Sequence, residues 1–167
     1  MRQTEPEGGG VFPIIEIVSG GQTGADRAAL DFAIAEGIPH GGWIPRGRRT
    51  EAGPLPRRYR MREMATEAYE ARTERNVIDS DGTLLLSHGP LAGGSALTLA
   101  LARKHEKPSL HLDLADTPIA DAAARARRWL NREGIGTLNV AGPRASEDPR
   151  IYAATHRILT RLFGSPA

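Results

Sequence analysis

The feature that most constrains the fold is the stretch of residues 14–30, where an apolar run ends in a glycine-rich turn and an alanine-rich segment follows at once. Most residues of the run are β-branched, as a buried strand prefers. Gly20, Gly21 and Gly24 allow a sharp turn and a close approach of the backbone to a ligand. A helix over residues 25–36 would begin with unpaired N–H groups and the positive end of its dipole, which together attract anions. The stretch therefore predicts a strand, a turn and a helix, with either an anion site or a plain tight turn at the junction.

The same turn carries four polar side chains, those of Gln22, Thr23, Asp26 and Arg27. A turn with a purely steric role needs none of them, so they favour a bound ligand. Thr23 could instead cap the helix, and Arg27 could pair with Asp31 four residues further on instead of with a phosphate. The glycine spacing matches neither the dinucleotide fingerprint nor the Walker A loop. The turn therefore predicts an anion site of another kind.

Strand-like and helix-like segments alternate along the rest of the chain. Strands are predicted over residues 14–18, 41–44, 83–87, 109–114 and 137–141, and helices over residues 25–36, 66–76, 96–105, 116–132 and 149–163. No Asn-Gly hairpin signal occurs. The alternation therefore predicts the α/β class, as a three-layer Rossmann-like parallel sheet of about five strands with helices on both faces.

Three turns follow predicted strands, at residues 19–24, 88–95 and 142–144. Parallel sheets bind ligands at the carboxyl ends of their strands, so the fold brings these turns to one edge. The second and third turns add further candidate ligand contacts, with tight packing or helix capping as the alternative: Gly93, Gly94, Ser95, Gly142 and Arg144. His88 borders the same edge, whereas Asp79 and Asp81 precede a strand and predict a structural turn at the opposite edge.

Composition excludes several classes of protein. The chain has 167 residues, no cysteine and a net charge of +2, so disulfides, cysteine–zinc sites and thiol catalysis are ruled out. The histidines show no metal-ligand spacing, and no metal site is predicted. No apolar run approaches the ~20 residues of a membrane helix, and residues 1–12 lack the apolar core of a signal peptide. We therefore expect a cytoplasmic protein that does not enter membranes, with a flexible tail at residues 1–12 and a single Rossmann-like ligand-binding domain at residues 13–167.

A basic segment, residues 46–62, holds seven arginines and one acid, Glu51. It could close over an anionic ligand as a lid, form a subunit contact or a solvated loop, or bind nucleic acid. Its one aromatic residue, Tyr59, gives weak support for base stacking, so nucleic acid is not the expected partner. Arg46 and Arg48 are the candidate ligand contacts in this segment.

Five segments together resemble the molybdenum-cofactor carrier family: SGGQTGADRAALDFA (19–33), GGWIPRGRRTEAGPLPRRY (41–59), RTERNVIDSDGTLLL (72–86), GPLAGGSALTLALA (89–102) and LNVAGPR (138–144). The resemblance extends over roughly residues 14–162. It implies a Rossmann-like protein, related to the lysine-decarboxylase-like (LOG-like) superfamily, that carries molybdenum cofactor (molybdopterin) as a small anionic, phosphate-bearing ligand. It also implies self-association into homo-oligomers, and molybdoenzymes or cofactor-biosynthesis proteins as partners.

Related nucleotide phosphoribohydrolases carry the motif Pro-Gly-Gly-x-Gly-Thr-x-x-Glu, whose glutamate is catalytic. The nearest match here, residues 91–97, contains no acid, so a binding protein without a catalytic residue is expected. The alternative is a nucleotide-derivative sensor or nucleotide-processing enzyme of the same superfamily, with Asp26 as general acid or base. The ligand contacts predicted on all these grounds are Gly20, Gly21, Gln22, Thr23, Gly24, Asp26, Arg27, Arg46, Arg48, Gly93, Gly94, Ser95, Gly142 and Arg144.

Overall fold

A central sheet of five parallel strands organises the computed structural model, which describes residues 13–14 and 16–164. The strands are β1 (Glu16–Val18), β2 (His40–Gly41), β7 (Gly82–Ser87), β8 (Ser109–Asp113) and β9 (Thr137–Ala141). Their order across the sheet is β2-β1-β9-β7-β8, so the last strand of the chain lies between β1 and β7. The carboxyl ends of β1, β9 and β7 therefore meet at one edge. The predicted tail lies outside the described residues.

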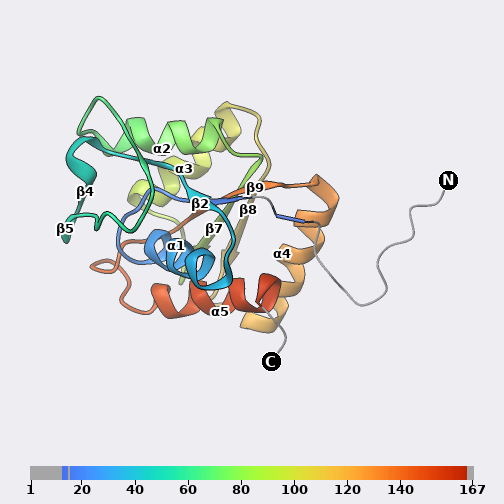
Figure 1. The fold of residues 1–167 in the computed structure, drawn as a ribbon. Helices are drawn as coiled ribbons and strands as arrows, with labels where there is room; N and C mark the ends of the chain where they lie inside the picture. Colours follow the sequence, from blue (N-terminus) through green and yellow to red (C-terminus); the bar gives the residue numbers. More distant parts are fainter. Residues whose placement is uncertain (1–12, 15, 165–167) are drawn as a thin grey trace.

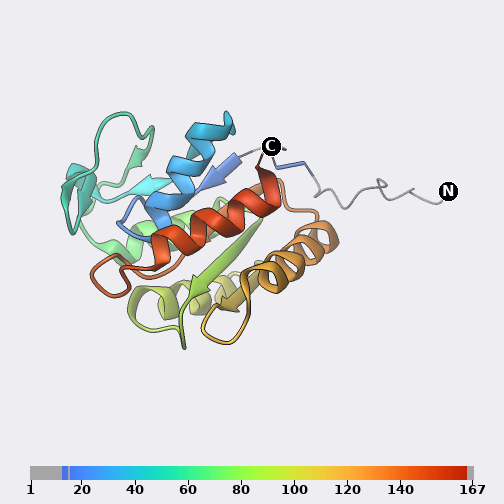
Figure 2. The same cartoon turned by 90° about the horizontal axis from the view of Figure 1, so that it is seen from below.

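The described part of the chain contains five α-helices, which cover the two faces of the sheet: α1 (Ala25–Glu36), α2 (Tyr69–Ile78), α3 (Gly93–Lys104), α4 (Ile119–Glu133) and α5 (Ile151–Phe163). Helices α2 and α3 lie together on one face, and α1, α5 and α4 lie on the other (Figure 1). Seen from below, α5 packs between α1 and α4 (Figure 2). This arrangement confirms the predicted three-layer α/β fold. No helix in the described part of the chain is long and apolar enough to cross a membrane.

The main apolar core lies between the sheet and the α1/α5/α4 layer. Its large side chains include Phe32 of α1, Trp129 of α4 and Leu159 of α5, all nearly inaccessible to solvent. The α2/α3 face differs, because its buried residues include Arg72, Asn76, Ser95 and Thr98. Buried polar groups require partners. The α2/α3 face is therefore where a polar ligand would find hydrogen-bonding groups.

The strand predicted over residues 41–44 is interrupted at Gly42. This residue has φ 120°, and a Cβ there would lie 2.2 Å from the carbonyl oxygen of Ser19. The chain therefore leaves the central sheet after β2 and continues as β3 (Trp43–Ile44), which pairs with β6 (Arg62–Glu63).

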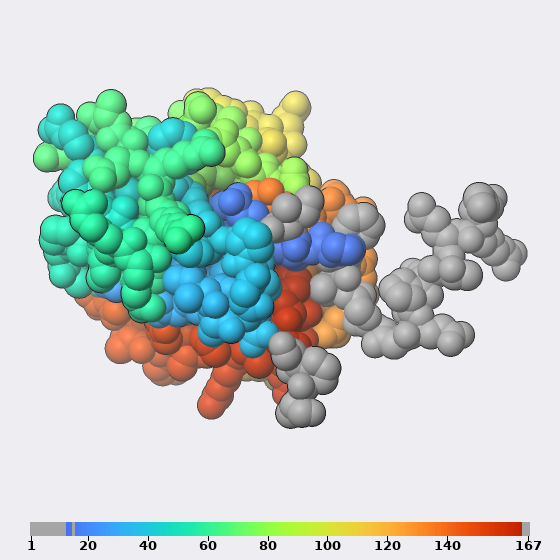
Figure 3. All heavy atoms as spheres, in the orientation of Figure 1, coloured from blue at the N-terminus to red at the C-terminus, as the bar shows by residue number. Residues whose placement is uncertain are grey.

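The basic segment of residues 46–62 is more ordered than its sequence suggests. It contains a 3-10 turn, η1 (Arg46–Arg48), and a short antiparallel pair, β4 (Arg49–Thr50) with β5 (Gly53–Pro54). Leu55 and Tyr59 anchor it in a second apolar cluster against Leu30 of α1. The Tyr59 hydroxyl also donates to Asp31 at 2.5 Å. The segment forms much of one end of the molecule (Figure 3).

Candidate functional site

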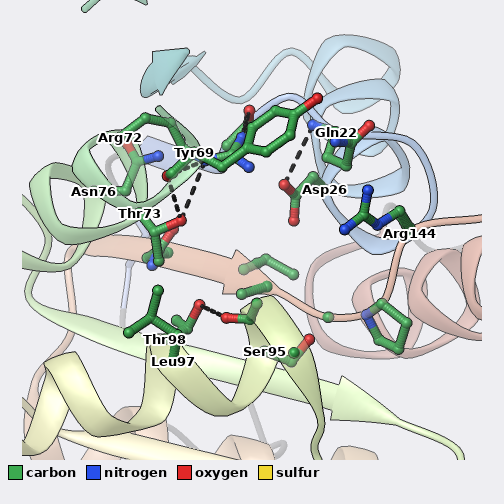
Figure 4. A pocket seen from close by; sticks show the side chains of 18 of the residues that line it. Gln22, Asp26, Tyr69, Arg72, Thr73, Asn76, Ser95, Leu97, Thr98 and Arg144 are labelled. Carbon is green, nitrogen blue, oxygen red and sulfur yellow. Dashed lines mark hydrogen bonds between the residues drawn. The ribbon is translucent and has the colours of Figure 1, made fainter. Parts of the chain in front are cut away.

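A cavity of about 380 Å³ lies at the carboxyl ends of β1 and β9, between α2, α3 and the first turn of α1 (Figure 4). Eight of the predicted contacts line it: Gly20, Gln22, Asp26, Gly93, Gly94, Ser95, Gly142 and Arg144. The structure thus brings residues of all three predicted turns to one cavity. The other six, Gly21, Thr23, Gly24, Arg27, Arg46 and Arg48, lie outside its lining.

Gln22 and Thr23 fasten the first turn to distant segments. The side-chain oxygen of Gln22 accepts the backbone N–H of Glu51 at 2.9 Å, and the Thr23 hydroxyl donates to the Glu51 carboxylate. The Thr23 oxygen also accepts the N–H of Ala145 at 3.0 Å. Helix α1 begins after Gly24 without a side-chain cap, so Thr23 does not fill the capping role considered for it.

The three other predicted arginine contacts make interactions away from the cavity. Arg27 lies with its guanidinium carbon 5.4 Å from the centre of the Tyr59 ring. Arg46 is exposed and pairs with Glu67 at 3.6 Å. Arg48 donates to three backbone carbonyls of its own segment. These three arginines therefore make their contacts with the basic segment or at the surface. The cationic side chains that line the cavity are Arg72 and Arg144.

The glycines divide into two groups by what a side chain would meet. A Cβ at Gly24 would lie 2.4 Å from the carbonyl oxygen of Pro143, and one at Gly142 would lie 2.5 Å from that of Leu86. Both positions need glycine for packing, and Gly24 needs it also for its φ of 82°. By contrast, a Cβ at Gly93 or Gly94 would meet nothing within 4 Å. The open space at the start of α3 is therefore available to a ligand.

We expect Gly142→Ala to lower the free energy of unfolding by about 2 kcal/mol, because the added methyl group meets backbone that cannot move aside cheaply. Gly94→Ala is the control: it has room and favours the helix by roughly 0.5–1 kcal/mol. Urea unfolding of both variants measures the difference. Equal stability of the two would contradict the packing role assigned to Gly142.

Helix α2 supplies five lining residues that the sequence reasoning missed: Tyr69, Glu70, Arg72, Thr73 and Asn76. All except Glu70 stand at positions i, i+3, i+4 and i+7, which share one face of a helix. That face turns inward over the cavity, where Arg72 and Asn76 are buried. A polar stripe at helical spacing is the signal that could have identified them.

Asp26 and Arg72 form the electrostatic centre of the cavity, and each is 8% exposed. Burial raises the pKa of Asp26 from 3.8 to about 6, while Arg72 and the backbone N–H of Gln22 oppose the rise. Burial likewise lowers the pKa of Arg72, against the attraction of Asp26. Arg72 also donates to the carbonyl oxygen of Gly20. The carboxyl of Asp26 is thus poised to change charge near neutral pH.

The first turn of α3 presents unused hydrogen-bond donors. Ser95 is 7% exposed, and its hydroxyl has no hydrogen-bond partner within residues 13–14 and 16–164. The N–H groups of Gly93 and Gly94 likewise have no acceptor in the described part of the chain. These donors stand at the positive end of the α3 dipole. The arrangement suits a phosphate or another oxyanion.

The two aspartates before β7 have structural partners at the opposite edge of the sheet. Asp81 accepts the backbone N–H groups of Gly136 and Thr137 at 3.0 and 2.8 Å. Asp79 accepts the indole N–H of Trp43 at 2.8 Å. Among the described residues, no group of three or more histidine, aspartate or glutamate side chains is placed to hold a metal ion.

The chain is similar to known proteins over most of its length. The family model described as "Circularly permutated YpsA SLOG family" matches residues 17–163. A search of curated proteins found no match. A crystal structure of a protein from Syntrophus aciditrophicus SB, named "Putative molybdenum carrier protein", superposes with a TM-score of 0.91 at 54% sequence identity. The likeness covers 92% of this chain and 97% of that one.

Proposed function

The chain belongs to the circularly permutated YpsA SLOG family, and we propose that it carries a phosphate-bearing pterin of the molybdenum-cofactor type in the cavity between α1, α2 and α3. The observation that carries the proposal is the Ser95 hydroxyl at the cavity wall. The residue is buried, but its hydroxyl has no hydrogen-bond partner in the described part of the chain and stands beside the free N–H groups of Gly93 and Gly94. The name of the 54% identical protein supports molybdenum cofactor as the ligand class.

Each part of such a ligand has a complementary group in the cavity. The phosphate fits the first turn of α3, where Ser95 and backbone N–H groups donate. The pterin ring carries N–H donors that the Asp26 carboxylate can accept. Tyr69 lines the cavity as an aromatic ring against which a flat heterocycle can pack, and Arg49 lies 4.5 Å from the Tyr69 ring centre on the basic segment. None of these roles requires covalent chemistry.

The proposal predicts that Ser95→Ala weakens binding of molybdopterin about tenfold, because a hydrogen bond to a charged group is lost. Stability should stay unchanged, since the hydroxyl bonds to no described residue. Ser80→Ala is the control, because Ser80 is also buried but lies at the amino edge of the sheet, where its hydroxyl donates to the carbonyl oxygen of Val77. Native mass spectrometry of protein made anaerobically in a molybdopterin-producing host detects the bound mass and the oligomeric state.

Absence of any pterin mass, together with no binding in direct titration, would overturn the carrier proposal. A bound nucleotide would favour the sensor or enzyme alternative. The raised pKa of Asp26 is the observation that favours the enzyme alternative, because a general acid or base is most effective when its pKa lies near the operating pH. If the protein turns over a nucleotide, Asp26→Asn should reduce that turnover at least ~100-fold while the nucleotide still binds.

A further inference from the structure

A second cavity adjoins the first at the same edge of the sheet. It measures about 330 Å³ and lies between the turn after β7 and the segment that leads into α5. Ser95, Pro143 and Glu147 line both cavities. Each cavity is near the lower limit of the ~300–1,000 Å³ typical of small-molecule sites. Together they form two compartments that share one wall.

The first turn of α3 lies at that shared wall. Ala92 lines the second cavity, Gly94 lines the first, and Ser95 lines both. The unused hydroxyl of Ser95 therefore lies at the boundary between the compartments, and the N–H groups of Gly93 and Gly94 lie next to it on the side of the first cavity. A phosphate group bound there has room for a substituent on either side.

The second cavity combines apolar and charged walls. Pro90, Leu91 and Pro149 form its apolar part, and Glu147, Asp148 and Arg150 also line it. His88, which the sequence placed beside the site, donates from Nδ1 to the Asp148 carboxylate at 2.6 Å, and their side chains are 15% and 12% exposed. The contact fixes the imidazole and leaves Nε2 without a partner among the described residues. Apolar walls with one fixed polar ring edge suit a nucleobase.

The charge of the shared wall is balanced. The Glu147 carboxylate alone would repel a phosphate, but it accepts a hydrogen bond from Nε of Arg144 at 2.7 Å. The terminal nitrogens of Arg144 have no acceptor within the described residues and can donate to phosphate oxygens in pairs. The wall therefore offers a guanidinium fork to a bridging phosphate without a net negative charge.

We propose that the two cavities together bind a pterin joined through a pyrophosphate to a nucleoside. The pterin occupies the first cavity, the pyrophosphate lies at the α3 start, and the nucleoside occupies the second cavity beside His88. This inference rests on the proposed function, from which it takes the position of the pterin. It adds that the nucleotide-extended ligand is preferred over the monophosphate.

The test is anaerobic calorimetric titration of the full chain with two probes, molybdopterin monophosphate and the same compound extended by guanosine monophosphate through a pyrophosphate. We expect the extended probe to bind at least ~10-fold more tightly. Leu91→Trp fills the second cavity and should abolish this preference while changing affinity for the monophosphate less than about twofold. His88→Asn keeps an N–H donor for the Asp148 carboxylate but removes the atom Nε2. This variant should reduce the preference for the extended probe about threefold.

Equal affinity of the native protein for both probes would overturn the two-compartment inference and leave the carrier proposal standing. A loss of affinity for both probes in Leu91→Trp would also overturn it, because the second cavity would then not be separate from the first. Binding of neither probe by the native protein would overturn both proposals. Thermal unfolding of each variant must match the native protein, which removes misfolding as the cause of any loss.

Discussion

Replacing Arg72 with methionine is expected to lower the free energy of unfolding by about 3 kcal/mol at pH 8. The guanidinium is buried, donates to the Gly20 carbonyl and attracts the charge of Asp26. Its removal leaves the Gly20 carbonyl without that donor and deprives the buried Asp26 carboxylate of its main cation, while the Gln22 N–H remains as a donor to Asp26. At pH 5 the loss should be smaller, because Asp26 then takes up a proton and no longer needs a cation. In thermal unfolding, 3 kcal/mol corresponds to roughly 6–12 °C for a chain of this size.

Arg75→Met in the same helix is the control for this experiment. Arg75 lies three residues further on, its side chain is half exposed, and it pairs with Asp79 at 3.2 Å. An exposed ion pair of this kind contributes less than ~1 kcal/mol. The role of Arg72 in compensating the Gly20 carbonyl and the Asp26 charge is contradicted if both variants lose the same stability. It is also contradicted if the loss from Arg72→Met is the same at pH 5 and pH 8.

The layer structure could be predicted because strand and helix signals are local. The run before Ser19 and the alanine-rich segment after Gly24 identify β1 and α1 from their own residues, and α1 has the predicted bounds. The small antiparallel pair β4–β5 was missed, because its two-residue strands are too short for any periodicity to register.

The role of individual site residues depends on partners far away in the sequence. Gly24 packs against residues 143–145, and Thr23 bonds to Glu51 and Ala145. A glycine that meets distant backbone and a glycine that faces a ligand look the same in the sequence. For this reason the three turns could be predicted to converge, but not which of their residues would face the cavity.

The polar face of α2 and the basic segment both show that polar or charged sequence does not by itself predict exposure to solvent. Arg72 and Asn76 have the polarity of a solvated face, yet they are buried because α2 lies over the cavity. The basic segment has the charge of a free loop, yet Leu55 and Tyr59 hold it against α1. Charge predicts exposure only where no buried partner or apolar anchor compensates.

Asp26→Asn is expected to raise the free energy of unfolding by about 2–3 kcal/mol at pH 7.5 and to leave it unchanged at pH 4. The pKa of Asp26 is about 6 in the folded protein, against 3.8 for the free side chain, and burial is the main cause. Between these pH values the folded state holds a proton that the unfolded state has released, so stability falls as pH rises through the window. Asparagine cannot ionise and avoids that loss. Urea unfolding at both pH values measures it.

Asp121→Asn supplies the matched control, since Asp121 is an exposed acid in the first turn of α4. It should be neutral or slightly destabilising at both pH values. A gain from Asp26→Asn that is equal at pH 4 and pH 7.5 would show that charge is not its cause.

The Asp26→Asn substitution should therefore raise the stability of the protein and lower its affinity for the ligand. A buried carboxylate that costs about 3 kcal/mol is compensated when a ligand donates N–H groups to it, because the hydrogen bonds favour the charged form. Molybdopterin should therefore bind Asp26→Asn about five- to tenfold more weakly, although that variant is the more stable protein at pH 7.5. A mere packing role for Asp26 predicts equal affinity of the two proteins. Such a trade between stability and function is typical of a binding site and not of a structural core.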